Sequence, residues 1–458
     1  MAQNNEQTNK TEGALQQVSL AKKLGFWYLW AIAVGAVVGD GIFMLMGSAF
    51  SEAGPSSVLA FFIAGVLQAF LMISFGELAV GMPSAGGPQL WGERLLGKEW
   101  GVISNLSFAI GWIIAGGSTG LAIGAYTQQL LGLNGVEWQI IFALAWNLLF
   151  ALANIAGVIV SATFQFILTA SLVIIMVIFG IAGVTLIDPN NFSPFMPNGM
   201  MGMIFAIPMG VYAYMGASTV VYAGEETRSA INLPKVLVWS SVTFIAVYTL
   251  SQIVVVGSIP YSLVPEMAEN MISPYTLAAE HLFGGVAATI MNLAAWLAAA
   301  TCLLMGTMYA PPRSLYALAR AGYRIPRSLS SISKTTRVPV MGTIITLIVS
   351  ELLVLLGWFD PNFVYVTLAL QLVFAWCVSW LISLAAVFAY RKKYAAEVQQ
   401  LKWKIPLYPI TPIIGLVGII AVIVFTFMYS IIDLIAGIIW VSLLYVATKY
   451  YICKDRID

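Results

Sequence analysis

The chain has 458 residues, of which 60% are hydrophobic and only 9% are charged. Soluble globular proteins carry about 25% charged residues, so this composition excludes a soluble domain and is typical of a polytopic membrane protein. The formal net charge of +1 gives no electrostatic reason to expect a nucleic-acid partner. Residues 1–20 are polar and predict a disordered cytoplasmic tail rather than a cleavable signal peptide.

Twelve apolar stretches follow along the chain, and each approaches the roughly 20 residues that a membrane-spanning helix needs. Short polar or turn-forming segments separate them, so we interpret each stretch as one helix. The expected crossings lie near residues 25–47, 57–82, 101–131, 138–157, 160–186, 203–223, 236–258, 284–310, 338–358, 363–390, 405–429 and 431–451.

Three of the connecting segments have recognisable patterns. Residues 84–100 mix apolar side chains with Glu, Arg and Lys, which predicts an amphipathic segment at the membrane interface. Residues 314–327 read as a basic helix that ends at Gly322 and Pro326. Residues 188–199 are rich in Pro and Asn and predict an irregular extracellular segment.

The distribution of charge supports this assignment independently. With these twelve crossings, all 21 Lys and Arg fall on one side, and the loops on the other side carry acids or no charge. Basic loops stay in the cytoplasm under the positive-inside rule. We therefore expect a multi-pass protein of the cytoplasmic membrane with both termini in the cytoplasm.

The first stretch contains residues that a helix in lipid avoids, namely Gly35, Gly39, Asp40 and Gly41. Gly costs about 1 kcal/mol relative to Ala in a helix, and Asp costs roughly 2.5–3.5 kcal/mol at the bilayer centre. Non-helical backbone at this depth is tolerated only where it is buried in protein or lines water. We expect the helix to break here and its backbone to face a cavity.

The sixth stretch has a matching interruption, formed by Pro208, Gly210 and the small residues 216–219. Interrupted helices in corresponding positions of two halves indicate an inverted-repeat transporter with its site near the midplane. The alternative is that these residues are only helix-packing contacts. The pattern predicts one repeat over residues 21–200, a second over 201–400, and two further helices with a cytoplasmic C-terminus in 401–458.

The motifs around these breaks resemble those of the amino acid–polyamine–organocation (APC) superfamily of secondary transporters. The resemblance covers about residues 20–430, with four motifs in the family's order. They are Gly-Asp-Gly-Ile-Phe at 39–43; Phe-Gly-Glu-Leu at 75–78 with Pro-Ser-Ala-Gly-Gly at 83–87; Tyr-Met-Gly at 214–216 with Gly-Glu-Glu-Thr-Arg at 224–228 and Asn-Leu-Pro at 232–234; and Arg-Ser-Leu-Tyr-Ala-Leu-Ala-Arg-Ala-Gly at 313–322.

The resemblance implies an all-α fold of about twelve transmembrane helices in a 5+5 inverted repeat, with helices 1 and 6 broken. Substrate is then held between helices 1, 3, 6, 8 and 10. Half-helix N-termini suit a carboxylate, and carbonyls at the opposing half-helix suit an ammonium. The substrate-binding residues expected from the breaks and from helix 8 are Gly39, Asp40, Gly41, Ile42, Tyr212, Tyr214, Met215, Gly216, Ala217, Ser218, Thr301 and Met305.

Two aromatic side chains of the sixth stretch, Tyr212 and Tyr214, are candidates for a lid over the substrate that adds cation–π attraction. The alternative is that they are packing or lipid-facing aromatics. Thr307 in the eighth stretch and Gln371 in the tenth are further candidates for lining the pocket.

Two departures from the family pattern concern charge. The family usually has Ser or Ala where this chain has Asp40, and no Lys stands at 165–172, where some members place a proton-carrying Lys. An ionised Asp40 favours a substrate with an amino group, such as a polyamine or amino alcohol. Alternatively, Asp40 is protonated and couples transport to protons, or it only caps the half-helix.

For the remaining titratable residues we expect no direct contact with the substrate. Glu77 is a second coupling candidate, although its position near the cytoplasmic end favours pairing with an Arg or a backbone group. We assign no role to Glu351. His281 is expected to be solvated, and the three cysteines have no metal-ligand spacing and read as packing residues.

These observations predict a secondary active transporter of amino acids or related amines that works by alternating access. A zwitterionic amino acid exchanger, with Asp40 coupling protons or capping, is the alternative reading. A channel would show filter repeats, and an enzyme would show a catalytic constellation; the sequence has neither, nor a soluble domain to act as a sensor. The expected partners are a small-molecule substrate, lipid and a coupled proton or counter-substrate, with no cofactor, metal or nucleic acid.

Overall fold

The computed structural model describes Leu20, residues 22–264 and residues 273–454, and in these residues the backbone is helical with no strands. The predicted tail at 1–20 therefore lies almost wholly outside the described residues. The helical elements are α2 (Phe26–Val37), α3 (Asp40–Ala53), η1 (Gly54–Ser56), α4 (Ser57–Gly81), α5 (Pro88–Leu96), α6 (Lys98–Leu130), α7 (Val136–Ile155), α8 (Val158–Gly183), η2 (Pro189–Phe192), α9 (Gly199–Tyr214), η3 (Ala217–Glu225), α10 (Asn232–Ser258), η4 (Tyr261–Leu263), α12 (Pro274–Phe283), α13 (Gly285–Thr301), η5 (Cys302–Thr307), α14 (Ala310–Arg320), η6 (Arg327–Ser330), α15 (Val340–Leu356), α16 (Pro361–Lys393), α17 (Ala395–Gln400), α18 (Ile410–Tyr429), α19 (Ile431–Ala447) and η7 (Thr448–Ile452).

Each of the predicted apolar stretches contains helix in the structure. Within the described residues, nine helical stretches are long and apolar enough to cross a membrane, and the longest, Phe26–Gly81, contains α2, α3 and α4 with the interruptions between them. Two shorter apolar helices lie at Val340–Leu356 and Ile410–Thr426. The protein is therefore an all-helical, multi-pass membrane protein.

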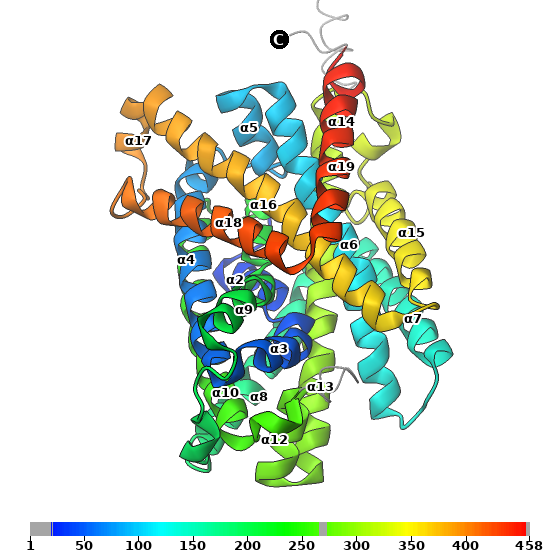
Figure 1. Ribbon diagram of the computed structural model, residues 1–458. Coiled ribbons are helices and arrows are strands. Elements are labelled where there is room, and N and C mark those ends of the chain that lie inside the picture. Colours follow the sequence, from blue (N-terminus) through cyan, green and yellow to red (C-terminus); the bar gives the residue numbers. More distant parts are fainter. Residues whose placement is uncertain (1–19, 21, 265–272, 455–458) are drawn as a thin grey trace, which may run out of the picture.

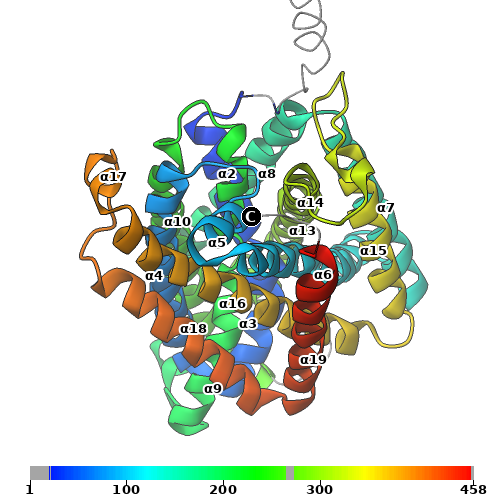
Figure 2. The same ribbon diagram turned by 90° about the horizontal axis from the view of Figure 1, so that it is seen from above.

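The helices form an inner group and two outer flanks. Seen from above, α6, α13 and α16 run through the interior, while α7 and α15 lie on one flank and α18 and α19 on another (Figure 2). Helices α6 and α16 have 33 residues each and pack extensively against each other. The outer helix α19 leaves most of its apolar side chains exposed, as expected for a helix that faces lipid.

Both predicted breaks are present. Helix α2 ends at Val37 and α3 begins at Asp40, so the chain turns at Val38 and Gly39. Helix α9 ends at Tyr214, and Met215 is extended before the 3₁₀ segment η3 starts at Ala217. The segments on either side of each break pack in pairs, α3 against α9 and α2 against η3. This packing brings the two breaks together inside the protein.

The connecting segments differ from expectation mainly in their boundaries. The amphipathic segment contains α5, which begins only at Pro88 because residues 83–87 form turns. The basic helix α14 starts earlier than predicted, at Ala310, and ends at Arg320. The Pro- and Asn-rich segment is mostly irregular but contains the short 3₁₀ turn Pro189–Phe192.

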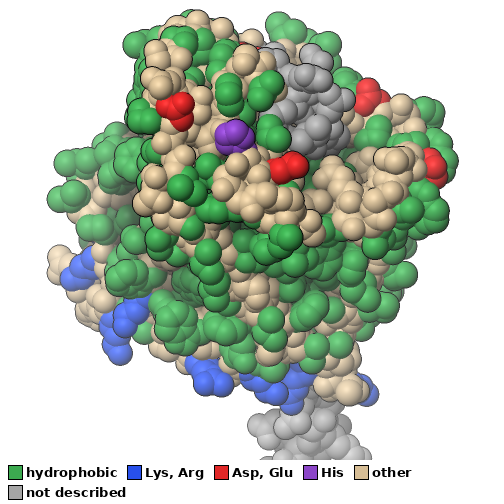
Figure 3. Space-filling model, turned by 90° about the horizontal axis from the view of Figure 1, so that it is seen from below, with side chains coloured by type: hydrophobic (Ala, Val, Ile, Leu, Met, Phe, Trp, Pro, Cys, Tyr) green, Lys and Arg blue, Asp and Glu red, His purple; other side chains and the backbone are tan. Residues whose placement is uncertain are grey.

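Charged segments gather at opposite ends of the molecule. Figure 1 places α5, α17 and the end of α19 at the end where the C-terminus lies, and α12 at the other end. The elements at the C-terminal end contain or adjoin the basic residues Arg94, Arg391–Lys393 and Lys449. The opposite face carries acidic side chains and the single His, with Lys and Arg at the left and lower edges of the view (Figure 3). We call the first end the basic end.

Candidate functional site

The break in the first crossing places a carboxylate inside the protein. Asp40 is the first residue of α3 and its side chain is 1% exposed. The residue at the N-cap is Gly39, which has no side chain to satisfy the backbone N–H groups of the first turn. Asp40 is therefore held where the dipole of α3 favours negative charge.

Three hydroxyl groups from three other helices surround this carboxylate. Thr119 of α6 donates to Oδ1 over 2.8 Å. Tyr365 of α16 donates to Oδ2 over 2.7 Å, and Tyr212 of α9 is 3.3 Å from the same oxygen. Both oxygens thus have hydrogen-bond donors, but none of these donors carries a positive charge.

A small cavity of about 20 Å³ adjoins the carboxylate, which is enough for about one water. Its lining contains no Lys or Arg among the described residues. An amino acid or amine of similar size therefore fits only if side chains around the cavity move. The lining residues are Ala36, Val37, Gly39, Asp40, Gly41, Trp112, Ala115, Thr119, Tyr212, Ala213, Met215, Cys302, Leu372 and Trp376.

The two breaks are held against each other by a side chain of α10. The hydroxyl of Tyr248 lies 3.0 Å from the Val37 carbonyl oxygen and 3.1 Å from the Ala213 carbonyl oxygen. Both carbonyls belong to the last turns before a break, where backbone acceptors lose their helical partners. Tyr248 is fully buried, so it fixes the relative position of the two interrupted helices.

Glycine is required at two points of close approach. Gly216 has φ of +131°, and a Cβ there would lie 1.9 Å from the Ala36 carbonyl oxygen. A Cβ at Gly41 would lie 2.6 Å from Cδ1 of Tyr212, so the absent side chain lets this ring rest on α3. These glycines allow the breaks to cross in contact.

The structure divides the predicted site residues into three groups. Those that line the cavity are Gly39, Asp40, Gly41, Tyr212 and Met215. Those that are buried nearby without lining it are Ile42, Gly216, Ala217, Ser218, Thr301 and Met305. Thr301 still reaches the first break, because its hydroxyl is 3.4 Å from the Val38 carbonyl oxygen.

Tyr214 forms the third group, because it does not face the cavity. Its ring packs against Phe244 and Tyr248 of α10, with centroid separations of 5.4 and 4.9 Å. Two residues along a helix turn the side-chain direction by about 200°. Tyr212 and Tyr214 therefore point to opposite sides of α9, and only Tyr212 approaches Asp40.

Gln371, expected from the tenth stretch, also points away. Its amide donates to the Asp433 carbonyl over 2.7 Å and accepts from Trp440 over 3.1 Å, which ties α16 to α19. The next residue, Leu372, lines the cavity instead, since one residue rotates the helix face by about 100°. Thr307 bonds to the Trp112 carbonyl over 3.0 Å and does not line the cavity.

Glu77 and His281 lie as the sequence predicts. Arg391 donates twice to Glu77, over 2.7 and 2.6 Å, and the Ile405 amide adds a third bond over 3.0 Å. His281 is exposed on α12. Glu351 is half-buried on α15, and its Oε2 finds no hydrogen-bond partner among the described residues.

Sequence reasoning missed the residues that α6, η5 and α16 contribute, which are Trp112, Thr119, Cys302, Tyr365 and Trp376. One signal was present: Thr119 lies in the run Gly-Gly-Ser-Thr-Gly at 116–120, whose small residues resemble those of the breaks. No pattern singled out Tyr365. Cys302, interpreted as packing, is buried but borders the cavity.

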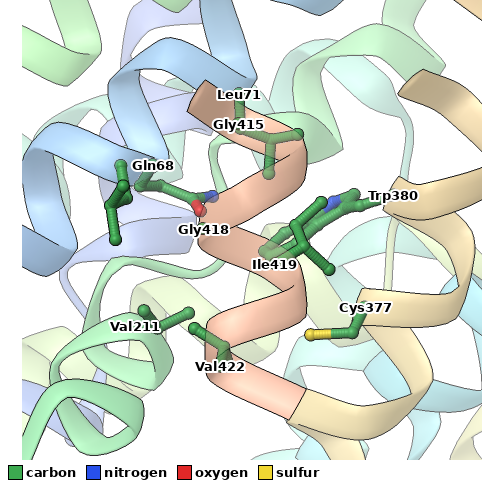
Figure 4. A pocket seen from close by; sticks show the side chains of 10 residues that line it. Gln68, Leu71, Val211, Cys377, Trp380, Gly415, Gly418, Ile419 and Val422 are labelled. Atoms are coloured by element: carbon green, nitrogen blue, oxygen red, sulfur yellow. The ribbon is translucent and has the colours of Figure 1, made fainter. Parts of the chain in front are cut away.

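Another small cavity lies between α4, α9, α16 and α18, where Gln68 of α4 and Cys377 and Trp380 of α16 point inward (Figure 4). Its other lining side chains are apolar, and it contains no carboxylate. The Gln68 amide nitrogen has no partner among the described residues. This cavity offers little to bind a charged group, so the Asp40 cavity is the better candidate site.

An all-helical membrane protein whose interrupted helices enclose a buried carboxylate is the class that this fold and site define. The chain belongs to the amino acid permease family, whose model matches residues 24–448.

Similar proteins from Bacillus subtilis (strain 168) extend over most of the chain. The amino-acid permease RocC is 27% identical over 413 residues, which is 84% of each chain. The branched-chain amino acid permease BcaP is 24% identical and covers 71% of this chain and 72% of its own. The methylthioribose transporter is 26% identical, and the match covers 96% of this chain and 94% of the transporter.

Proposed function

We propose that the protein is a secondary active transporter of amino acids or related amines, and that Asp40 holds the ammonium group of the substrate. The observation that carries the proposal is a buried carboxylate at the meeting point of two helix breaks, with three hydroxyl donors and no Lys or Arg beside it in the described part of the chain. A substrate ammonium would supply the missing positive charge as a charge-assisted hydrogen bond.

The same geometry supports an α-amino acid over a simple amine. The second break begins η3 at Ala217, beside the first, and the first N–H groups of a helix have no partner within it. Such groups suit a carboxylate. Relatives named as permeases of amino acids support the same choice.

The proposed architecture is a 5+5 inverted repeat of residues 21–200 and 201–400, followed by two further helices, with both termini in the cytoplasm. The breaks in the first and sixth crossings support the repeat. The basic residues in and beside α5, α16 and η7, which lie at one end, support the orientation. Alternating access then moves the broken helices against the rest of the bundle.

Aromatic side chains block the path from the cavity toward the basic end. Trp112 and Trp376 line the cavity and contact each other with centroids 4.8 Å apart. Phe108, one turn nearer the basic end on α6, stacks between Trp376 and Tyr222 at 4.9 and 4.7 Å. This layer must separate before a substrate leaves on that side.

Asp40 as a proton-coupling group remains the second candidate role. Its support is the absence of a positive partner among the described residues, which makes a buried ionised carboxylate costly. A role as a simple helix cap has less support, because Thr119, Tyr212 and Tyr365 of other helices donate to its oxygens.

The test is uptake of labelled amino acids, polyamines and amino alcohols into proteoliposomes that contain the purified protein. We expect saturable uptake of an amine-bearing solute, and at least a tenfold loss in Asp40→Asn, as expected for a hydrogen bond between charged groups. Asp433→Asn is the matched control, because this acid lies on α19 and interacts with Ser430 and Gln371.

Two outcomes would overturn the proposal. Unaltered uptake in Asp40→Asn would remove Asp40 from the site. Non-saturating flux with unitary currents in a planar bilayer would indicate a channel.

A further inference from the structure

A second cavity lies directly beside the Asp40 cavity and has a different character. It has a volume of about 40 Å³ and lies between α3, α9 and α16. Apart from the hydroxyls of Ser48 and Tyr212, its lining side chains are apolar. They are Leu45, Ser48, Pro208, Met209, Tyr212, Val366, Ala369, Leu370 and Val373. We call it the apolar cavity.

The two cavities share one wall, which is Tyr212. The hydroxyl oxygen of Tyr212 is 3.3 Å from Asp40 Oδ2. The ring rests on α3 where Gly41 has no side chain. A rotation of this single side chain would therefore join a pocket that ends in a carboxylate to a pocket lined by hydrocarbon.

The positions along α3 give the direction and length of the joined pocket. Asp40 is the first residue of α3, and Leu45 follows five residues later, about 8 Å along the helix axis. On α16, Tyr365 donates to Asp40 while its neighbour Val366 lines the apolar cavity. The apolar cavity thus begins beside the carboxylate and extends along α3.

From this arrangement we infer that the apolar cavity receives the aliphatic side chain of the substrate while Asp40 holds its ammonium. This inference rests on the proposed function and adds the substrate class, which is an amino acid or amine with an unbranched or branched hydrocarbon chain. Charged side chains are disfavoured, because nothing in the cavity lining offers a counter-ion. Tyr212 is then a specificity-determining residue that moves aside when a chain enters.

The test measures how strongly a series of 2-amino acids with chains from methyl to n-butyl inhibits substrate uptake into proteoliposomes. Burial of each added methylene strengthens binding about fourfold. We therefore expect the inhibition constant to fall about fourfold with each carbon until the cavity is full.

Two variants change the cavity in opposite directions. Ala369→Leu fills it, and we expect the dependence on chain length to disappear. Val373→Ala enlarges it, and we expect the best inhibitor to become one carbon longer. Ala385→Leu adds the same side chain at an exposed position of the same helix and should change nothing.

The outcomes separate this inference from the proposed function. If wild-type protein transports an amine-bearing solute but both cavity variants keep the wild-type dependence on chain length, the apolar cavity does not hold the side chain. If a cavity variant weakens inhibition equally for all chain lengths, the cavity is only part of the entry path and does not hold the side chain. If wild-type protein transports no solute of the panel, the proposed function fails, and this inference with it.

Discussion

At the scale of single residues, the central fact is the way in which the Asp40 carboxylate is satisfied. A side chain that is 1% exposed in a membrane protein loses nearly all its hydration. Neutral hydroxyls replace part of it, and hydrogen bonds to a charged group contribute about 1.5–3 kcal/mol each. Under the proposed function, the ammonium group of the substrate supplies the positive charge that these neutral hydroxyls lack.

The Thr119 hydroxyl gives a direct test of this account. Thr119→Val keeps the side-chain shape but removes the 2.8 Å bond to Oδ1. With one donor fewer the ionised carboxylate is less stable, so we expect about a tenfold rise in the KM for uptake. Thr426→Val on α18 is the control, because that hydroxyl bonds only within its own helix, over 2.8 Å to Val422. A KM unchanged in Thr119→Val would show that the hydroxyl does not support the charge.

At the scale of elements, the two interrupted helices matter because they touch. The break between α2 and α3 lies beside the break between α9 and η3, and Tyr248 of α10 contacts a carbonyl at each break. The contact between them depends on Gly216, whose conformation and surroundings exclude a side chain. The breaks therefore behave as one unit in which a change on either helix affects the other.

Gly216→Ala should disrupt this unit. The added Cβ would lie 1.9 Å from the Ala36 carbonyl oxygen, and the backbone has a φ of +131° that non-glycine residues avoid. We expect a loss of more than about 2 kcal/mol in stability, seen as a lower thermal midpoint in detergent, together with loss of uptake. Gly415→Ala on α18 meets atoms only at 3.4 Å or beyond and should be close to neutral. Equal midpoints for the two variants would contradict the contact.

The breaks were predictable from sequence, whereas their partners were not. Glycine, proline and a carboxylate inside apolar stretches are composition signals, and they located both breaks to within a few residues. Which side of a neighbouring helix faces a break depends on rotation about its axis, where one residue changes the direction by about 100°. For this reason the sequence could not separate Tyr212 from Tyr214 or Leu372 from Gln371, and it gave no sign of Tyr365.

At the scale of the whole molecule, ion pairs join elements at the basic end. Glu226, the residue after η3, accepts two bonds from Arg313 of α14 over 2.8 and 2.9 Å, and both side chains are buried. The neighbouring Glu225 pairs with Arg320 in a more exposed position. The Glu226 carbonyl also accepts from the Leu24 amide over 2.9 Å, which ties the start of α2 to the end of η3. If the protein opens at this end, these contacts must either break or move together with the elements they join.

Removing one partner of the buried pair should loosen this end. Glu226→Gln leaves Arg313 buried without a counter-ion, which typically costs 3–5 kcal/mol. We expect faster alkylation of Cys302, which borders the Asp40 cavity, by a charged maleimide added from the side of the basic end. The measurement uses protein with Cys377 and Cys453 replaced by Ser. Glu225→Gln, at the more exposed pair, should have a smaller effect, and equal labelling rates in all variants would contradict a closing role.

The most direct test of the central claim is a structure of the protein with its best transported substrate bound. We predict that the substrate nitrogen lies within about 3 Å of a carboxylate oxygen of Asp40, between the two breaks, with the ring of Tyr212 moved from its present position. A substrate bound elsewhere, or bound between the breaks with its nitrogen directed away from Asp40, would contradict the account.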